Sequence, residues 1–106
     1  MGAQFEKQNS SRSGTTQTVP YTGVSATCTN PFGSQTYQIR IASTSACNYK
    51  VVEAAGGAAT ATDIFLPNNW VEYVTVSPGQ KISAIQAPTN GLVTGTAGTL
   101  YVTEVS

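Results

Sequence analysis

Short runs of β-branched and aromatic residues, separated by turn-forming residues, are the feature that most constrains how this chain can fold. Apolar and polar residues alternate in Gln35 to Ala42, in Cys47 to Val52 and in Thr99 to Val105. This alternation predicts half-buried antiparallel strands. Turn signals recur about every 8–12 residues, and no stretch carries the apolar stripe of an amphipathic helix. The sequence therefore predicts an all-β fold, an antiparallel β-sandwich of Greek-key or jelly-roll type with about six to eight short strands.

The stretch from Ile64 to Ile85 holds the densest apolar runs and the only tryptophan, Trp70. Between the runs stands Ser77-Pro78-Gly79-Gln80, in which proline presets φ and glycine tolerates a positive φ, as a type II turn requires. We therefore predict a β-hairpin made of a strand over 69–76 and a strand over 80–86. The first of these strands is partly apolar on both faces, which is typical of a strand covered on both sides or lying at a subunit contact.

The middle of the chain predicts a second hairpin and a loop. The linker 43–46 between the alternating runs 35–42 and 47–52 is short enough to join them as a hairpin. Residues 53–61 are rich in alanine, but Gly56-Gly57 opposes a helix, so we predict a flexible loop there. Residues 62–66 predict a short strand that ends at Pro67.

The chain of 106 residues is long enough for one small domain. Residues 1–18 are polar, poor in aliphatic side chains and without periodicity, which predicts a flexible N-terminal arm. Such an arm is either a disordered terminus or a segment that orders against a neighbouring subunit, with Phe5 and Arg12 as candidate contacts. The β-sandwich domain is expected over residues 19–106.

Charge is scarce in this chain. Only 9% of the residues are charged and the formal net charge is zero, whereas roughly 25% is usual in soluble domains. A chain with so little charge is expected to lie packed against other protein. Nucleic acid is not an expected partner, because no basic patch is present. The sequence has no long apolar run for a membrane span and no apolar signal-peptide core, so we expect synthesis in a cytoplasm.

The residues offer little for catalysis. Histidine is absent, which excludes the serine and cysteine nucleophile arrangements and most zinc sites. Glu72 and Glu104 interrupt apolar strands and are the one pair that could act as in a glycosidase, although each could equally face solvent or a subunit contact. We therefore predict no enzyme activity, no catalytic or metal-binding residue, no cofactor and no small-molecule substrate.

Cys28 and Cys47 are the only cysteines. They could form a disulfide within the chain, link neighbouring subunits, or remain small reduced thiols in partly buried positions. The last alternative is favoured for a chain made in a cytoplasm.

Three parts of the sequence resemble a group of small virion proteins of tailed bacteriophages. The shared features are an opening Gln-Ile-Arg-Ile strand (38–41), a Leu-Pro segment running to Glu-Tyr (66–73), a Pro-Gly turn followed by Lys-Ile (78–82), and a closing Gly-Thr-Leu-Tyr-Val-Thr-Glu (98–104). The resemblance covers residues 35–105 and contains no catalytic motif.

This resemblance implies a structural subunit on the virion surface, a decoration (cement) protein that contacts the major capsid protein and copies of itself as a homotrimer. Candidates for the core or for a subunit interface are Trp70, Val71, Tyr73 and Tyr101, with the core favoured for each aromatic residue. One alternative is a head–tail adaptor, tail or fibre subunit. A second is a carbohydrate-binding β-sandwich, in which Trp70, Tyr21 and Tyr37 would stack on sugar rings.

Overall fold

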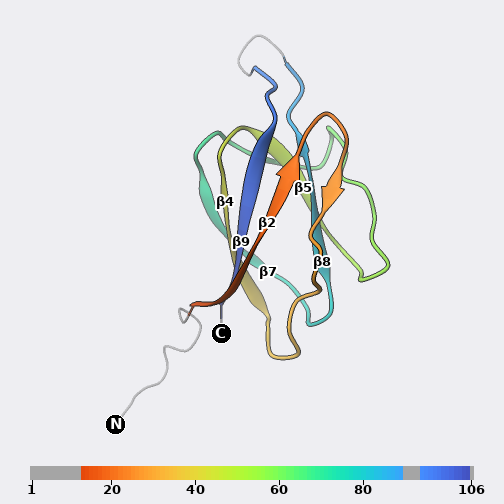
Figure 1. Cartoon of the computed structure of the whole chain (residues 1–106), viewed down its shortest axis with the longest axis vertical. Coiled ribbons are helices and arrows are strands. Elements are labelled where there is room, and N and C mark those ends of the chain that lie inside the picture. The colour runs from red at the N-terminus through yellow and green to blue at the C-terminus, as the bar shows by residue number, and fades with distance from the viewer. Residues whose placement is uncertain (1–12, 90–93, 106) are drawn as a thin grey trace.

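The computed structural model describes residues 13–89 and 94–105. Within them the chain forms two four-stranded antiparallel sheets and no helix, which confirms the predicted all-β sandwich (Figure 1). The first sheet has the order β2-β9-β4-β7 and the second has the order β3-β8-β5-β6. The strands are β2 (Ser13–Tyr21), β3 (Ala26–Thr27), β4 (Gln38–Ser43), β5 (Cys47–Val52), β6 (Ile64–Leu66), β7 (Val71–Thr75), β8 (Lys81–Gln86) and β9 (Gly98–Val105).

The core lies between the two sheets and follows the predicted alternation. Ile39 and Ile41 of β4 are fully buried, while their neighbours Gln38, Arg40 and Ala42 are half-buried on the other face. The inner faces of the two sheets meet in one apolar cluster, because successive strand residues point to opposite sides. The largest fully buried side chains are those of Tyr21, Ile39, Ile41, Leu66, Ile82 and Leu100.

The predicted turn at Ser77–Gln80 is confirmed, but the hairpin around it is wrong. The amide of Gln80 donates to the carbonyl of Ser77 at 3.2 Å, and Gly79 has a φ of 84°. However, β7 pairs with β4 and β8 pairs with β3 and β5, so the turn carries the chain from one sheet to the other. The turn is instead hydrogen-bonded to Phe32: the amide of Gly79 donates to the carbonyl of Phe32 at 2.9 Å.

The second predicted hairpin is wrong for a related reason. β4 and β5 lie in different sheets, and the linker between them crosses the end of the sandwich. It is held there by residues distant in sequence: the amide of Thr44 donates to Thr99 O at 3.1 Å, and the buried hydroxyl of Tyr21 donates to Ser45 O at 2.6 Å. A short linker fits either connection, so its length alone could not separate them.

Among the described strands β2 to β9, one pair of consecutive strands is adjacent in the same sheet. These strands are β5 and β6, joined by a segment without strand or helix that contains the predicted loop 53–61. The short strand expected before Pro67 is confirmed as β6. Every other step along the chain from β2 to β9 passes from one sheet to the other.

The predicted N-terminal arm is too long. β2 begins at Ser13 and pairs with β9 from Ser13 opposite Val105 to Tyr21 opposite Gly98. Residues 13–18 therefore belong to the sandwich, which begins before residue 19. Their polar composition is compatible with an edge strand, since outward Thr16 and Thr18 are exposed and burial begins at Val19. The interface candidates Phe5 and Arg12 lie outside the described residues.

Candidate functional site: an open sheet face

The outer face of the β2-β9-β4-β7 sheet is exposed along two rows of side chains that run across all four strands. We define this open face by the two rows that the strand register sets: Thr16, Thr103, Arg40 and Tyr73 in one, and Thr18, Tyr101, Ala42 and Val71 in the other. All eight residues are exposed or half-buried. Arg40 is the only charged member, so the face consists mainly of hydroxyl groups, aromatic rings and short aliphatic side chains.

The outer face of the other sheet is covered in part by the chain itself, although Lys50, Phe65 and Thr27 on that face remain exposed. Ser83 of β8 donates from its hydroxyl to Gly57 O at 2.5 Å, and Asn48 of β5 donates from its side-chain amide to Asp63 O at 3.0 Å. Both polar side chains are buried although their strand positions point outward. The segment 53–63 therefore lies over the part of this sheet that holds Ser83 and Asn48, whereas all eight side chains of the open face are exposed or half-buried.

Three of the predicted interface candidates meet on the open face. Val71, Tyr73 and Tyr101 are 42%, 58% and 46% exposed, and Trp70, directly before β7, is 51% exposed. The alternative that they belong to the core is therefore wrong for these four residues in the described chain. The sequence could not decide this, because β7 is partly apolar on both faces. The inward positions of this strand belong to Glu72 and Val74, which are half-buried.

Glu72 and Glu104 both point between the sheets, but the structure does not bring them together as a catalytic pair. They lie on opposite sides of β4, with Glu72 opposite Ile41 and Glu104 opposite Ile39. Each has its own donors. The Tyr49 hydroxyl donates to Glu72 at 2.9 Å, while the Thr36 hydroxyl and the Gly33 amide donate to Glu104.

The two cysteines are buried and free, in agreement with the favoured alternative of buried thiols, and the alternative of a disulfide within the chain is wrong. Cys28 lies beside Ile82 of β8, to whose carbonyl its amide donates at 2.9 Å. Ile82 in turn is opposite Val51, four residues from Cys47 on β5. Strand spacings therefore place the two Cα atoms roughly 16 Å apart, far beyond the span of a disulfide. Burial raises the pKa of both thiols, that of Cys47 to about 11, so they are poor nucleophiles.

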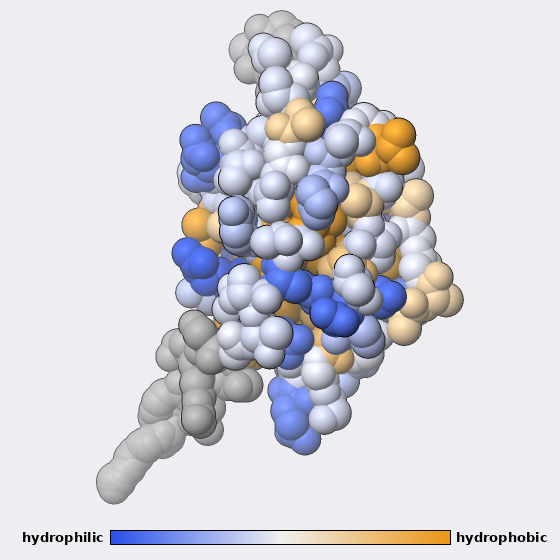
Figure 2. Space-filling model, in the orientation of Figure 1, coloured by the Kyte–Doolittle hydropathy of each residue, from blue (hydrophilic) through white to orange (hydrophobic). Residues whose placement is uncertain are grey.

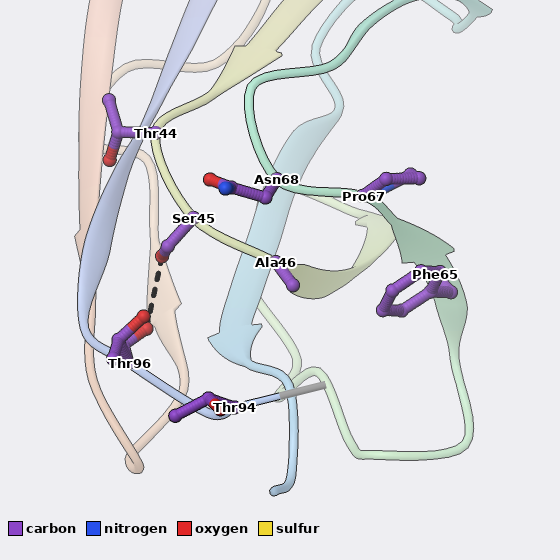
Figure 3. A pocket seen from close by; sticks show the side chains of 8 residues that line it. All are labelled: Thr44, Ser45, Ala46, Phe65, Pro67, Asn68, Thr94 and Thr96. Carbon is purple, nitrogen blue, oxygen red and sulfur yellow. Dashed lines mark hydrogen bonds between the residues drawn. The ribbon is translucent and has the colours of Figure 1, made fainter. Parts of the chain in front are cut away.

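A hollow of about 680 Å³ opens at one end of the sandwich (Figure 3). Its lining is uncharged and combines hydroxyl groups, one amide and a half-exposed ring: Thr44, Ser45, Ala46, Phe65, Pro67, Asn68, Thr94 and Thr96. The Ser45 hydroxyl donates to Thr96 O across it at 3.0 Å. Of the aromatics predicted to stack on sugars, Tyr21 is instead 1% exposed and belongs to the core.

Within residues 13–89 and 94–105, no three His, Cys, Asp or Glu side chains gather as metal ligands would. The same residues include no helix with the length and apolar character to cross a membrane. Comparison with models of known protein families, with curated proteins and with solved structures finds no match. We take the open face as the candidate functional site of the described chain.

Proposed function

We propose that this chain is a non-enzymatic structural subunit of a bacteriophage virion, a decoration (cement) protein that lies on the capsid surface and bridges capsomers. The observation that carries the proposal is the open face, which exposes Val71, Tyr73 and Tyr101 around a single charge, Arg40. Tyrosine and arginine are enriched in protein–protein interfaces, whereas lysine and carboxylates are depleted. A wide face with a single charge suits contact with the major capsid protein.

The low charge of the whole chain supports the same proposal. Figure 2 shows a surface dominated by residues of intermediate hydropathy, with strongly hydrophilic residues in a few separate groups. With 9% charged residues and no formal net charge, the subunit has little long-range repulsion against its neighbours or against further copies of itself. Low charge of this kind is compatible with dense packing on a shell.

The order of the strands gives further support. We propose that the sandwich is of the jelly-roll type, since consecutive strands alternate between the sheets everywhere except at β5–β6. Jelly rolls are found in viral capsid domains and in lectins. The fold thus supports a virion subunit and a carbohydrate-binding module alike, and the exposed surfaces must separate the two.

The virion proposal is tested by fractionating a lysate of the source on a density gradient and locating the chain by mass spectrometry. We expect it to sediment with DNA-filled heads in a copy number close to that of the shell protein. A low, fixed copy number per particle would instead indicate a head–tail adaptor, tail or fibre subunit. Recovery only in the soluble fraction would overturn the virion proposal.

The role of the open face is tested by adding purified chain to heads that lack it. Tyr101→Asp places a carboxylate in the middle of the face and is expected to weaken binding at least tenfold. The matched control is Val24→Asp, since Val24 is 76% exposed in the turn between β2 and β3, outside the open face. Equal binding by the two variants would exclude the open face as the contact.

The second candidate function, carbohydrate binding, is favoured by the end hollow. Its hydroxyl and amide groups can bond to sugar hydroxyls, and Phe65, 44% exposed, offers a ring for stacking. A glycan array tests it directly. Specific binding at micromolar affinity that is lost in Phe65→Ala would replace the virion proposal with this one.

A further inference from the structure

Among the strands of the described residues, four lie at sheet edges, and of these only β7 lacks a feature that discourages pairing. β2 carries Pro20 and a register irregularity between Ser13 and Thr16. β3 has two residues, and β6 has three and is followed by Pro67. By contrast, β7 has five residues, Val-Glu-Tyr-Val-Thr, with no proline, glycine, lysine or bulge. Short strands, prolines and bulges are the usual protections of a sheet edge.

The backbone groups of β7 that point away from β4 can be identified from its flanks. Trp70 O accepts from Ser43 N at 3.1 Å and Val76 N donates to Tyr37 O at 2.9 Å, so both residues point toward β4. Because backbone groups alternate along a strand, Val71, Tyr73 and Thr75 point the other way. Their amides and carbonyls find no partner among the described residues.

The one charge on β7 does not block this edge. An inward-pointing charge can itself protect an edge strand, and Glu72 does point inward. Its carboxylate, however, already accepts a hydrogen bond from Tyr49 at 2.9 Å and is half-buried between the sheets. The side chains beside the free backbone groups are those of Val71, Tyr73 and Thr75, which are exposed and uncharged.

We propose that β7 pairs antiparallel with β7 of a second copy about a two-fold axis at Tyr73, which joins two four-stranded sheets into one of eight strands. In this register Val71 lies opposite Thr75 of the second copy, and all three outward-pointing residues form hydrogen-bonded pairs. Glu72 lies opposite Val74, so the two carboxylates do not face each other. A register centred on Glu72 would place like charges in direct opposition, which is unfavourable.

The pairing extends the open face across two subunits. The row that contains Arg40 and Tyr73 continues through the axis into the same row of the second copy. The contact is two-fold and isologous. It makes a dimer, whereas the resemblance to virion proteins implies a homotrimer. It concerns copies of this chain alone and does not depend on the proposed contact with a shell.

Light scattering of the full chain in solution, over about 1–100 μM, tests the proposal. We expect a mass of twice the chain mass of 11.0 kDa. Tyr73→Lys places two lysines against each other at the axis and is expected to weaken association at least tenfold. The control is Tyr101→Lys, an exposed position on the same face but on β9, two strands from the edge, and it should leave the mass unchanged.

A cysteine placed at the axis gives an independent measurement. Tyr73→Cys is expected to cross-link two copies under mild oxidation, because hydrogen-bonded partners in antiparallel strands have Cα atoms about 5.5 Å apart, within disulfide reach. Tyr101→Cys should not cross-link. The native thiols of Cys28 and Cys47 are buried and do not compete.

A monomer at all concentrations, a trimer, or a dimer that survives Tyr73→Lys would overturn the proposed pairing. Loss of the dimer in both lysine variants would also overturn it, in favour of a contact through the sheet face. None of these results bears on the virion proposal, which is decided by sedimentation with heads.

Discussion

The hydroxyl of Tyr49 on β5 donates a hydrogen bond of 2.9 Å to the carboxylate of Glu72 on β7 and so links the two sheets across the core. Tyr49 is 3% exposed. Burial raises its pKa, and the hydrogen bond to Glu72 and the charge of Glu72 raise it further, so the proton stays on Tyr49. With Glu72 held inward, its neighbours Val71 and Tyr73 are turned out to the open face. One polar contact in the core thus helps to fix which side chains the surface presents.

Removing this hydroxyl with Tyr49→Phe is expected to lower the free energy of unfolding by about 1–3 kcal/mol, because the Glu72 carboxylate loses its donor in a half-buried position. Urea denaturation measures it as a lower midpoint with an unchanged slope. The control is Tyr37→Phe, since Tyr37 is 62% exposed, and it should change stability by less than about 0.5 kcal/mol. Equal stability of both variants would show that the link contributes nothing.

Alkaline pH is expected to destabilise the fold. Burial raises the pKa of Cys47 from 9.0 to about 11, so the unfolded chain loses this proton at a lower pH than the folded chain. The contribution is therefore complete below pH 9 and is lost as the pH rises toward about 11. The expected slope is about 1.4 kcal/mol per pH unit for this proton. Tyr49, whose pKa is also raised, acts in the same direction at higher pH.

Urea midpoints at intervals between pH 7 and pH 11 measure this dependence. Cys47→Ala removes the thiol and should flatten the decline between pH 9 and pH 11, whatever its effect on stability at pH 7. A decline of the same steepness in this variant would exclude Cys47 as the cause.

Local patterns in the sequence are sufficient to predict where the strands lie but not which strands pair with each other. A few neighbouring residues determine the alternation around Ile39 and Ile41, the turn at Pro78-Gly79 and the end of β6 before Pro67. The sequence predicts all three correctly. The sheet to which a strand belongs depends on contacts far along the chain, such as that between Gly79 and Phe32. Both predicted hairpins failed for this reason.

The candidate site was predicted in part. The sequence identifies Val71, Tyr73 and Tyr101 as core or interface residues. Only the strand register, which places them on one outward face, decides between these two positions. No local signal could show that the segment 53–63 covers part of the opposite sheet, because this contact depends on pairs distant in sequence such as Ser83 with Gly57. The polar segment 13–18 predicts an arm by its composition, because the first buried side chain of this strand is that of Val19.

The segment 53–63 is expected to loosen when Ser83 is replaced. The fully buried hydroxyl of Ser83 bonds to Gly57 O at 2.5 Å and to the Thr27 hydroxyl at 2.7 Å, so Ser83→Ala leaves both groups without this partner. We expect hydrogen exchange of the Ala59 amide to accelerate about tenfold, a local loss of about 1.4 kcal/mol. Amides of β4 should exchange as before. Ser34→Ala, at an exposed loop position, is the control.

Gly98 lies where β9 begins, opposite Tyr21 of β2, and leaves no space for a side chain. An added Cβ would meet the hydroxyls of Ser45, Thr44 and Tyr21, the last two at 2.8 Å. Gly98→Ala is therefore expected to lower stability by about 1–3 kcal/mol through overpacking. Gly23→Ala is the matched control, because no atom lies within 4 Å of its added Cβ, and its effect should stay within about 0.5 kcal/mol.

The cause of the Gly98→Ala loss can be separated from a general effect on β9 by a double-mutant cycle. Ser45→Ala removes the hydroxyl oxygen that the new methyl group would approach most closely, so part of the clash disappears. The loss on adding Gly98→Ala should then be smaller in the Ser45→Ala background than in the native chain, with a coupling of at least about 0.5 kcal/mol. Strictly additive losses would show that the penalty does not arise at the Ser45 hydroxyl.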